Sequence, residues 1–188
     1  MQMTEEKFQA MYSVRSLKDA ECAKDFDCGD EDLNEFITQE AALYKEALLA
    51  VSYIVEDKSC KNKVAAYFSL ANDKVSLAEF KSNSEFNRFR KRKFIHQKRL
   101  KSYPAVKLCR FGVNRTDRRA GIGSYLLDFI KTLFVTNNRT GCRFLTVDAY
   151  KEAVPFYLKN GFIPLTANNS DSYTELLYYD LYAAKNIE

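Results

Sequence analysis

Apolar side chains in the first half of the chain recur at helical spacing and then at strand spacing. The helical stripe lies between Asp30 and Ala50 and consists of Leu33, Phe36, Ile37, Ala41, Tyr44 and Leu48. Gly29 allows a turn before it, and the acids that follow favour a helix N-terminus. Two apolar stretches come next, Ala50–Val55 and Val64–Leu70, joined by the polar residues 56–63. This pattern predicts a helix over residues 30–50 and then a β-hairpin.

Residues 71–103 have a weaker periodicity and carry a run of basic residues. Eight cations lie in this run with no acid among them, and phenylalanine and leucine residues are interspersed. We expect a helix with one basic and one apolar face. The cations are Arg88, Arg90, Lys91, Arg92, Lys93, Lys98, Arg99 and Lys101.

The second half of the chain alternates between strand and helix patterns. Strands are predicted over residues 105–113, 142–149, 162–165 and 173–181, and helices over residues 121–135 and 152–160, with a turn at 137–141. Such alternation is typical of a mixed sheet covered by helices on both faces. We therefore predict an α/β fold, with residues 1–188 forming a single domain in which residues 71–103 are a basic insertion.

The amino-acid composition argues against several classes of protein and of catalytic site. The 188 residues are 46% hydrophobic and 29% charged, and no apolar run approaches the ~20 residues of a spanning helix. We expect neither a membrane anchor nor a signal peptide. Five cysteines at long spacings and a single histidine do not suit a disulfide framework, a metal site or a Ser-His-Asp triad. Free thiols indicate a cytoplasmic protein, and the net charge of +4 is compatible with an anionic partner.

The most informative motif is Arg118-Arg119-Ala120-Gly121-Ile122-Gly123, between a predicted strand and a predicted helix. Two glycines one residue apart let the backbone approach a ligand, so that several amide N–H groups and the helix N-terminus can bind one anion. Arg118 and Arg119 add positive charge. The alternative is an ordinary strand–turn–helix corner. Neither Gly-x-Gly-x-x-Gly nor Gly-Lys-Ser/Thr occurs, which excludes a dinucleotide fingerprint and a Walker A loop.

A second block follows the next predicted strand and reads Ala153-Val154-Pro155-Phe156-Tyr157-Leu158-Lys159-Asn160-Gly161-Phe162. Together the two motifs resemble the GCN5-related N-acetyltransferase (GNAT) superfamily. The acyl-CoA loop of that superfamily reads Arg/Gln-x-x-Gly-x-Gly/Ala, and its later block reads Ala-x-x-Phe-Tyr-x-Lys-x-Gly-Phe. Every fixed position of both patterns is matched here, in the same order, and the resemblance covers about residues 103–181.

The resemblance implies a sheet splayed near Val113 and acetyl-CoA as the acetyl donor. It implies that the diphosphate of acetyl-CoA rests on the backbone amides of residues 119–124, and that the pantetheine arm pairs with the strand Lys107–Val113. A backbone N–H in that strand can polarise the thioester carbonyl. The cofactor-binding residues implied in this way are Phe111, Val113, Arg118, Arg119, Ala120, Gly121, Ile122, Gly123 and Ser124.

Tyr157 corresponds to the family position that serves as general acid for the departing CoA thiolate in a direct transfer. The alternative for Tyr157 is a core aromatic on a short helix. No carboxylate lies in Lys107–Val113, so the general base is either a water relay or dispensable because the acceptor amine is already neutral. Tyr150 stands where many members have an asparagine that holds the pantetheine, a departure from the family pattern.

A narrower resemblance concerns the acceptor. Phe26-Asp27-Cys28-Gly29, followed by Leu33 and Phe36, is similar to the Phe-x-Cys-Gly-x-x-x-Leu-x-x-Phe/Tyr opening of GNAT toxins from bacterial toxin–antitoxin pairs. These toxins acetylate the amino group of aminoacyl-tRNA, so the resemblance implies that acceptor and a ribbon-helix-helix antitoxin as partner. Phe111 and Gly112 depart from the Arg-Leu-Ala-Val-like core of the subgroup.

The basic run suits this acceptor, because lysine and arginine with interleaved aromatics bind RNA phosphates. The residues assigned to nucleic acid are Arg88, Arg90, Lys91, Arg92, Lys93, Lys98 and Arg99. The alternative is a solvated helix face whose phenylalanines dock on the core. Two other functions stay open: the same chemistry on a polyamine-like or protein amine, and a catalytically silent acyl-CoA-binding or RNA-binding module. A homodimer is compatible with the sequence but not indicated by it.

Overall fold

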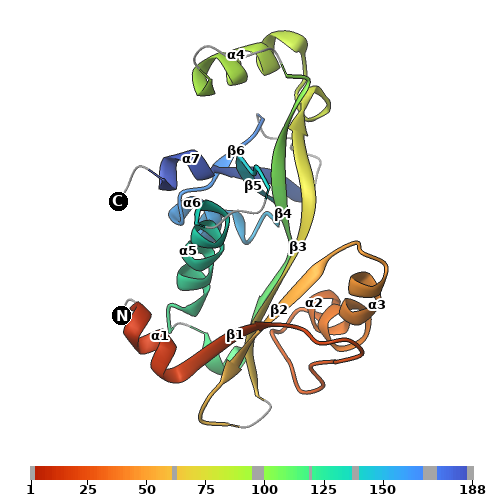
Figure 1. Ribbon diagram of the computed structural model, residues 1–188, viewed down its shortest axis with the longest axis vertical. Coiled ribbons are helices and arrows are strands. Elements are labelled where there is room, and N and C mark those ends of the chain that lie inside the picture. Colours follow the sequence, from red (N-terminus) through yellow and green to blue (C-terminus); the bar gives the residue numbers. More distant parts are fainter. Residues whose placement is uncertain are drawn as a thin grey trace. The chain divides into compact units, whose positions relative to one another are not determined.

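The computed structural model describes residues 3–60, 63–94, 100–118, 120–136, 140–166 and 173–185. Its strands hydrogen-bond in the order β1-β2-β3-β4-β5-β7-β6 (Figure 1). The β4–β5 pair is parallel, whereas β1–β2, β2–β3, β5–β7 and β6–β7 are antiparallel, which confirms the predicted mixed α/β sheet. The strands are β1 (Tyr12–Ser16), β2 (Val51–Asp57), β3 (Val64–Ser76), β4 (Ser102–Val113), β5 (Phe144–Tyr150), β6 (Ile163–Pro164) and β7 (Thr174–Asp180).

The chain divides into two compact units. The first consists of Met1–Ala71 and Leu108–Ile130, and the second of Asn72–Lys107 and Lys131–Glu188. The strands β3 and β4 contribute residues to both units, as does helix α5 (Ile122–Val135). The glycine motif belongs to the first unit, and Tyr157 and the basic run belong to the second.

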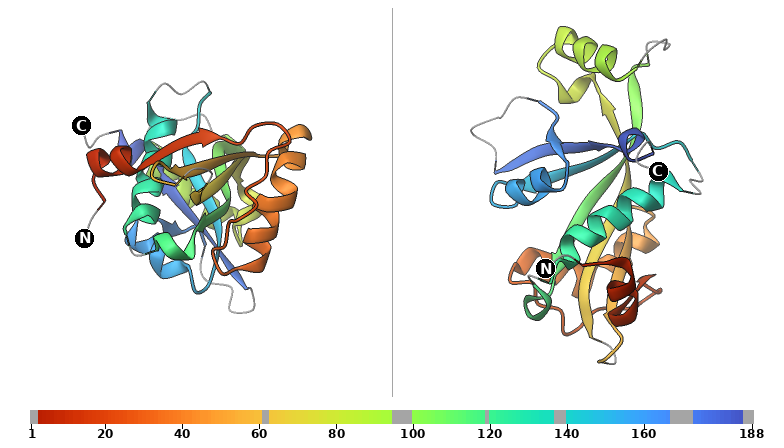
Figure 2. Two further views of the ribbon diagram at one scale, coloured as in Figure 1. Left: turned by 90° about the horizontal axis from the view of Figure 1, so that it is seen from below. Right: turned by 90° about the vertical axis from the view of Figure 1, so that its left-hand side faces the viewer.

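The first unit has helices on both faces of its strands (Figure 2). On one face, α1 (Glu5–Met11) packs against α5 through stacked rings of Phe8 and Tyr125, 4.1 Å apart. On the other face, a helical segment covers the core and comprises α2 (Glu31–Glu35), the π-helix η1 (Phe36–Glu40) and α3 (Ala41–Glu46). The core on that side consists of Leu17, Ala23, Phe26, Cys28, Phe36, Ile37, Ala41, Ile54 and Tyr67.

The predicted helix over residues 30–50 is present but shorter, and it contains a wide turn. The Asp30 side chain caps its start by accepting from the Leu33 N–H at 3.1 Å. At η1 the Ala41 N–H bonds to the Phe36 carbonyl five residues back, which places an extra residue in that turn. The buried stripe therefore stops at Ala41. The prediction was wrong for Leu48, which lies beyond the helix and is 92% exposed.

The N-terminal elements α1 and β1 were not predicted. Thr4 caps α1 by accepting from the Lys7 N–H at 3.4 Å, and the helix buries only Phe8. One apolar contact in seven residues gives little periodic signal. β1 is recognisable only from its pairing with β2, in which Val14 faces Val55.

The second unit is built around aromatic side chains. Helix α4 (Asn83–Lys93) packs onto the sheet through Phe86 and Phe89, and the Phe89 ring lies 5.6 Å from Phe144 and 5.5 Å from Tyr178. The predicted helix with an apolar face is thus confirmed for residues 83–93, whereas residues 71–76 continue strand β3 and Lys101 lies outside the helix. The buried cluster comprises Val75, Phe80, Phe86, Tyr103, Ala105, Phe144, Leu165 and Tyr178. Short elements complete the unit: the 3₁₀ turn η2 (Leu77–Glu79), α6 (Val154–Lys159) and α7 (Leu181–Ala184).

Candidate functional site

The segment that leads into the glycine motif is anchored by a buried carboxylate. Asp117 ends the 3₁₀ turn η3 (Arg115–Asp117), and its side chain is only 7% exposed. Its carboxylate lies 2.9 Å from the Lys63 Nζ and accepts a hydrogen bond from the Tyr12 hydroxyl at 3.3 Å. The hydrogen bond with Asp117 raises the pKa of Lys63, and burial together with Asp117 raises the pKa of Tyr12. Sequence reasoning missed this network, because Lys63 and Tyr12 are far from Asp117 in the chain.

The two arginines of this segment bind the turn that carries the Phe-x-Cys-Gly motif. The Arg118 guanidinium donates to the Cys28 carbonyl, and Arg115 pairs with Asp27 at 3.4 Å. Gly29 has a φ of +83°, a left-handed conformation that favours glycine, and the exposed Arg115 side chain lies directly beside its Cα. The motif and the start of the glycine loop are therefore one structural assembly. In this structure the Arg118 side chain serves that assembly.

The glycine loop leads directly into helix α5 through a left-handed glycine. Gly121 adopts a left-handed φ of +82°, and α5 starts at the next residue. The first-turn amides of a helix, here those of Ile122, Gly123 and Ser124, have no intrahelical acceptor and carry the positive end of the helix dipole. The Ile122 side chain is buried and fixes the helix start. Ala120 lies beside this turn, while Arg119 lies outside the described residues.

The strand that precedes the loop runs on after its pairing with β5 ends. β4 pairs with β5 over Ala105–Lys107 only, and the strand continues as far as Val113. Phe111 and Val113, whose main chains are the expected pantetheine contacts, are half-buried in this continuation. A Cβ on Gly112 would lie 2.9 Å from a Tyr67 ring carbon and 3.0 Å from a Phe26 ring carbon. The departure at Gly112 from the toxin pattern is thus explained by the two aromatic rings that pack against β4.

Tyr157 lies in the second unit, on the short helix α6. Its ring is buried and contacts Phe156 and Phe162, with centroids 5.3 and 5.4 Å away. Burial raises the pKa of the Tyr157 phenol well above its ordinary value, so the hydroxyl is protonated at neutral pH. A protonated hydroxyl can donate to a developing anion, although the packing alone is also that of a core aromatic.

Other residues of the same block hold α6 in place. Gly161 ends the helix with a φ of +81°, and Lys131 donates to the Asn160 carbonyl at 2.8 Å. Phe162 is buried, and its ring lies 5.8 Å from that of Tyr179. The motif residues around Tyr157 therefore serve to hold helix α6 in position.

The basic residues of α4 divide into two groups. Lys93 pairs with Asp180 at 3.0 Å, and the Arg90 guanidinium lies over the Phe86 ring at 5.4 Å, so both have structural contacts. Arg88, Lys91 and Arg92 are exposed and can meet phosphates. Cations in the last turn also stabilise the negative end of the helix dipole. Lys98 and Arg99 lie outside the described residues.

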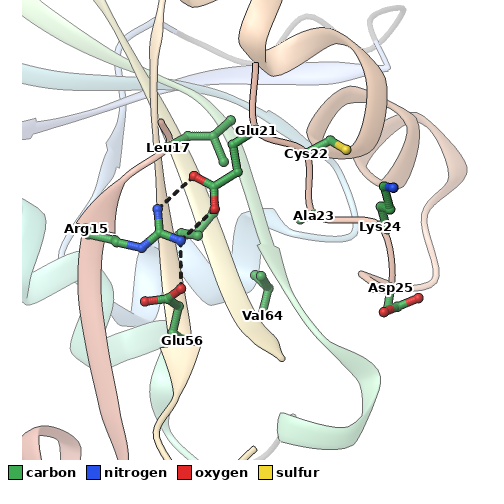
Figure 3. A pocket seen from close by; sticks show the side chains of 10 residues that line it. Arg15, Leu17, Glu21, Cys22, Ala23, Lys24, Asp25, Glu56 and Val64 are labelled. Atoms are coloured by element: carbon green, nitrogen blue, oxygen red, sulfur yellow. Dashed lines mark hydrogen bonds and ion pairs between the residues drawn. The ribbon is translucent and has the colours of Figure 1, made fainter. Parts of the chain in front are cut away.

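A polar pocket of about 280 Å³ lies in the first unit (Figure 3). None of the predicted site residues lines it. Arg15 crosses it and bonds to Glu21 at 2.6 and 2.8 Å and to Glu56 at 2.7 Å. The hydrogen bond from Arg15 lowers the pKa of Glu21 to about 2. The guanidinium is thus occupied by protein carboxylates, and we assign the pocket a structural role.

The described residues were also compared with what a metal site, a disulfide and a membrane-spanning helix require. Within the described ranges, no three histidine, cysteine, aspartate or glutamate side chains gather as a metal site. The five cysteines are all described and form no disulfide. None of the described helices has the length and hydrophobicity needed to cross a bilayer.

Comparison with known families decides the identity of the fold. Residues 94–181 match the model of the acetyltransferase (GNAT) domain. This segment of the chain is similar to a GNAT acetyltransferase domain. The match includes β4, the glycine loop, α6 and Tyr157, which are the elements that the two sequence motifs indicated. A search of curated protein sequences finds no match to the chain.

Solved structures extend the GNAT likeness beyond the family model. A tyrosine-to-phenylalanine mutant of KacT is 19% identical, with 95% of this chain and 99% of that chain covered and a TM-score of 0.74. AtaT complexed with acetyl-methionyl-tRNAfMet is 24% identical, with coverages of 93% and 97% and a TM-score of 0.73. AtaTR bound with acetyl-CoA is 23% identical, with coverages of 93% and 96% and a TM-score of 0.72. These likenesses confirm the predicted fold over nearly the whole chain.

Proposed function

We propose that the protein transfers the acetyl group of acetyl-CoA to the α-amine of an aminoacyl-tRNA and acts as the toxin of a toxin–antitoxin pair in the cytoplasm. The observation that carries the proposal is the near full-length fold shared with AtaT, which was solved with acetyl-methionyl-tRNAfMet. The Phe-x-Cys-Gly turn supports it, because this toxin-like motif is bound directly to the start of the glycine loop by Arg118.

Acetyl-CoA supplies the activated acetyl group, and the first unit offers residues that suit it. The amides of residues 122–124 and the left-handed Gly121 form the expected cradle for the diphosphate. The continuation of β4 past Lys107 offers main-chain groups at Phe111 and Val113 for the pantetheine amides. Arg118, held by Cys28, would then keep the loop in shape while the backbone binds the ligand.

Tyr157 is the residue we assign as general acid. The neutral amine attacks the thioester carbonyl, the C–S bond breaks, and the thiolate sulfur takes the phenol proton. The acylated nitrogen releases its extra proton to solvent, and the Tyr157 phenolate regains a proton from solvent. Burial raises the pKa of the Tyr157 phenol, and the same dry surroundings would raise that of a thiol leaving group, so the proton transfer stays feasible. An aminoacyl ester lowers the pKa of its own α-amine, so a strong general base is dispensable.

The proposed macromolecular partners are based on the exposed cations of α4 and on the structural similarity to KacT and AtaT. Exposed Arg88, Lys91 and Arg92 on α4 are suited to tRNA phosphates. KacTA was solved with DNA, and AtaT with the C-terminus of the antitoxin AtaR. A short ribbon-helix-helix protein encoded beside this chain is the corresponding partner here.

The test is incubation with labelled acetyl-CoA and, in parallel, aminoacyl-tRNA, deacylated tRNA and a polyamine. We expect label only on aminoacyl-tRNA. Tyr157→Phe should lower the transfer rate by about 100-fold or more and leave acetyl-CoA affinity unchanged. Tyr173→Phe, at an exposed position, is the matched control and should be fully active. Label on the polyamine alone would contradict the tRNA acceptor, and absence of any transfer would favour a silent binding module.

A further inference from the structure

Arg110 is a half-buried arginine whose hydrogen-bonding capacity is largely unused. Its Nε is buried and makes no hydrogen bond to any described residue. The nearest carboxylate oxygen, on Asp32, lies 3.8 Å from that Nε, which is too far for a hydrogen bond. One terminal nitrogen donates to the adjacent Cys109 carbonyl at 3.1 Å. A buried donor without a partner costs about 1–3 kcal/mol, so its retention requires an explanation.

Arg15 shows that the fold can provide carboxylate partners for an arginine of similar exposure. The Arg15 side chain is 29% exposed and that of Arg110 is 31% exposed. Arg15 has two carboxylates within 2.7 Å, from Glu21 and Glu56. The guanidinium of Arg110 instead lies over the Phe36 ring, with its central carbon 5.0 Å from the ring centre. A cation–π contact of this kind restricts where the guanidinium can lie, and the exposed part of the side chain remains open to a ligand.

The position of Arg110 on β4 relates it to the proposed reaction. Successive side chains of a strand point to opposite faces, so Arg110 shares a face with Gly112 and not with Phe111. Phe36 on η1 covers Arg110, and Phe26 and Tyr67 cover Gly112. Phe111, whose main chain is the expected pantetheine contact, is the next residue along the strand. An acceptor that approaches the thioester from the η1 side therefore comes within reach of the guanidinium.

We infer that Arg110 binds an anionic group of the acceptor, and that this group is the phosphodiester closest to the aminoacyl ester. The inference rests on the proposed function, since it names a substrate contact of that same reaction. A guanidinium edge matches two phosphate oxygens, and charge-assisted bonds of this kind are among the strongest in proteins. A polyamine carries only positive charge and is repelled by the same group. Arg110 thus selects a nucleotide-linked amine over a polycationic one.

The Asp32 carboxylate competes with that phosphate for the Arg110 guanidinium. Its carboxylate is 60% exposed on α2 and faces the Nε of Arg110 from the edge of ion-pairing distance. Removing this charge leaves Arg110 in place and increases its attraction for an anion. Asp32→Asn and Arg110→Gln should therefore change the KM for the acceptor in opposite directions.

The experiment measures steady-state acetylation with aminoacyl-tRNA and with an amino acid methyl ester, which has the amine and the ester but no phosphate. For Arg110→Gln we expect the KM for aminoacyl-tRNA to rise about 10-fold or more, while the kcat/KM for the methyl ester and the affinity for acetyl-CoA stay within about twofold. Arg110→Lys should restore part of the loss, and Asp32→Asn should lower the KM for aminoacyl-tRNA. Arg15→Gln is the matched control and should leave both KM values unchanged.

The outcomes separate this inference from the function on which it rests. Equal losses on both acceptors, or no loss for Arg110→Gln, would overturn the role of Arg110 while the acetyltransferase function stands. No acetylation of aminoacyl-tRNA by the unaltered protein would overturn the proposed function and the inference together. If Arg110→Gln fails to fold, judged by lost acetyl-CoA binding, Asp32→Asn decides, and an unchanged KM in that variant overturns the inference.

Discussion

The ion pair between Asp117 and Lys63 should contribute measurably to stability, and its contribution can be compared with that of an exposed pair. In Asp117→Asn the side chain keeps its shape and can still accept from Tyr12, but Lys63 loses its charged partner at 2.9 Å. A hydrogen bond to a charged group contributes about 1.5–3 kcal/mol. Lys63 is 30% exposed and keeps Asp57 at 3.3 Å, so we expect a loss near the lower end, about 2 kcal/mol.

Asp19 provides the matched control. It pairs with Lys45 at a similar distance, 2.8 Å, but its side chain is 95% exposed. Exposed pairs contribute about 0–1 kcal/mol, so Asp19→Asn should be close to neutral. Urea and thermal unfolding measure both variants. For a chain of this length a loss of about 2 kcal/mol lowers the Tm by about 4–8 °C.

The pH dependence gives a second measure of the same pair. Asp117 raises the pKa of Lys63, so the stabilisation is fully present below the ordinary lysine pKa of 10.5 and is lost as the pH rises through the higher folded value. The stability gap between the natural protein and Asp117→Asn should therefore shrink above about pH 10.5. Equal effects of the two asparagine substitutions, or a gap independent of pH, would refute this reasoning.

Three further predictions concern the strand, the polar pocket and α4. Gly112→Ala should destabilise the protein by about 1–3 kcal/mol in urea unfolding, because its Cβ meets two rings, whereas Gly141→Ala, with open space around it, should be neutral. The pKa of Glu21 is lowered from 4.5 to about 2, so its bond with Arg15 stabilises the fold above pH 4.5, and that stability should disappear between pH 4.5 and 2 in the natural protein but not in Glu21→Gln. A triple glutamine variant of the exposed α4 cations should weaken tRNA binding and reduce the slope of log affinity against log salt by about 2–3, with acetyl-CoA affinity unchanged; an unchanged slope would remove α4 from the RNA interface. The substituted cations are Arg88, Lys91 and Arg92.

The strongly periodic elements could be predicted from the sequence, and the irregular ones could not. α5 and α6 lie within two residues of their predicted bounds, because apolar spacing and glycine turns marked them directly. The π-turn at η1 could not be foreseen. There the Thr38 hydroxyl donates to the Asn34 carbonyl at 2.8 Å, a side-chain contact that competes with the regular helix bond. The spacing of the apolar residues does not indicate this π-turn.

The candidate site shows the same division. The glycine loop and Tyr157 could be found because each lies in a contiguous motif with fixed spacing. The contacts of Lys63 and Arg110 could not, since both depend on residues brought together by the fold: Asp117 for Lys63, and Phe36 for Arg110. A lysine in a polar connection and an arginine in a strand look ordinary until their partners are known.

Direct binding of acetyl-CoA tests the central claim, that the backbone of the glycine loop holds the diphosphate of the donor. Isothermal titration of the natural protein should give saturable binding with one site per chain. Gly121→Val, which places a branched side chain at a φ of +82°, should weaken the affinity at least about 10-fold, because the distorted loop can no longer aim its amides. Titration without heat or saturation, or equal affinity in Gly121→Val, would contradict the account.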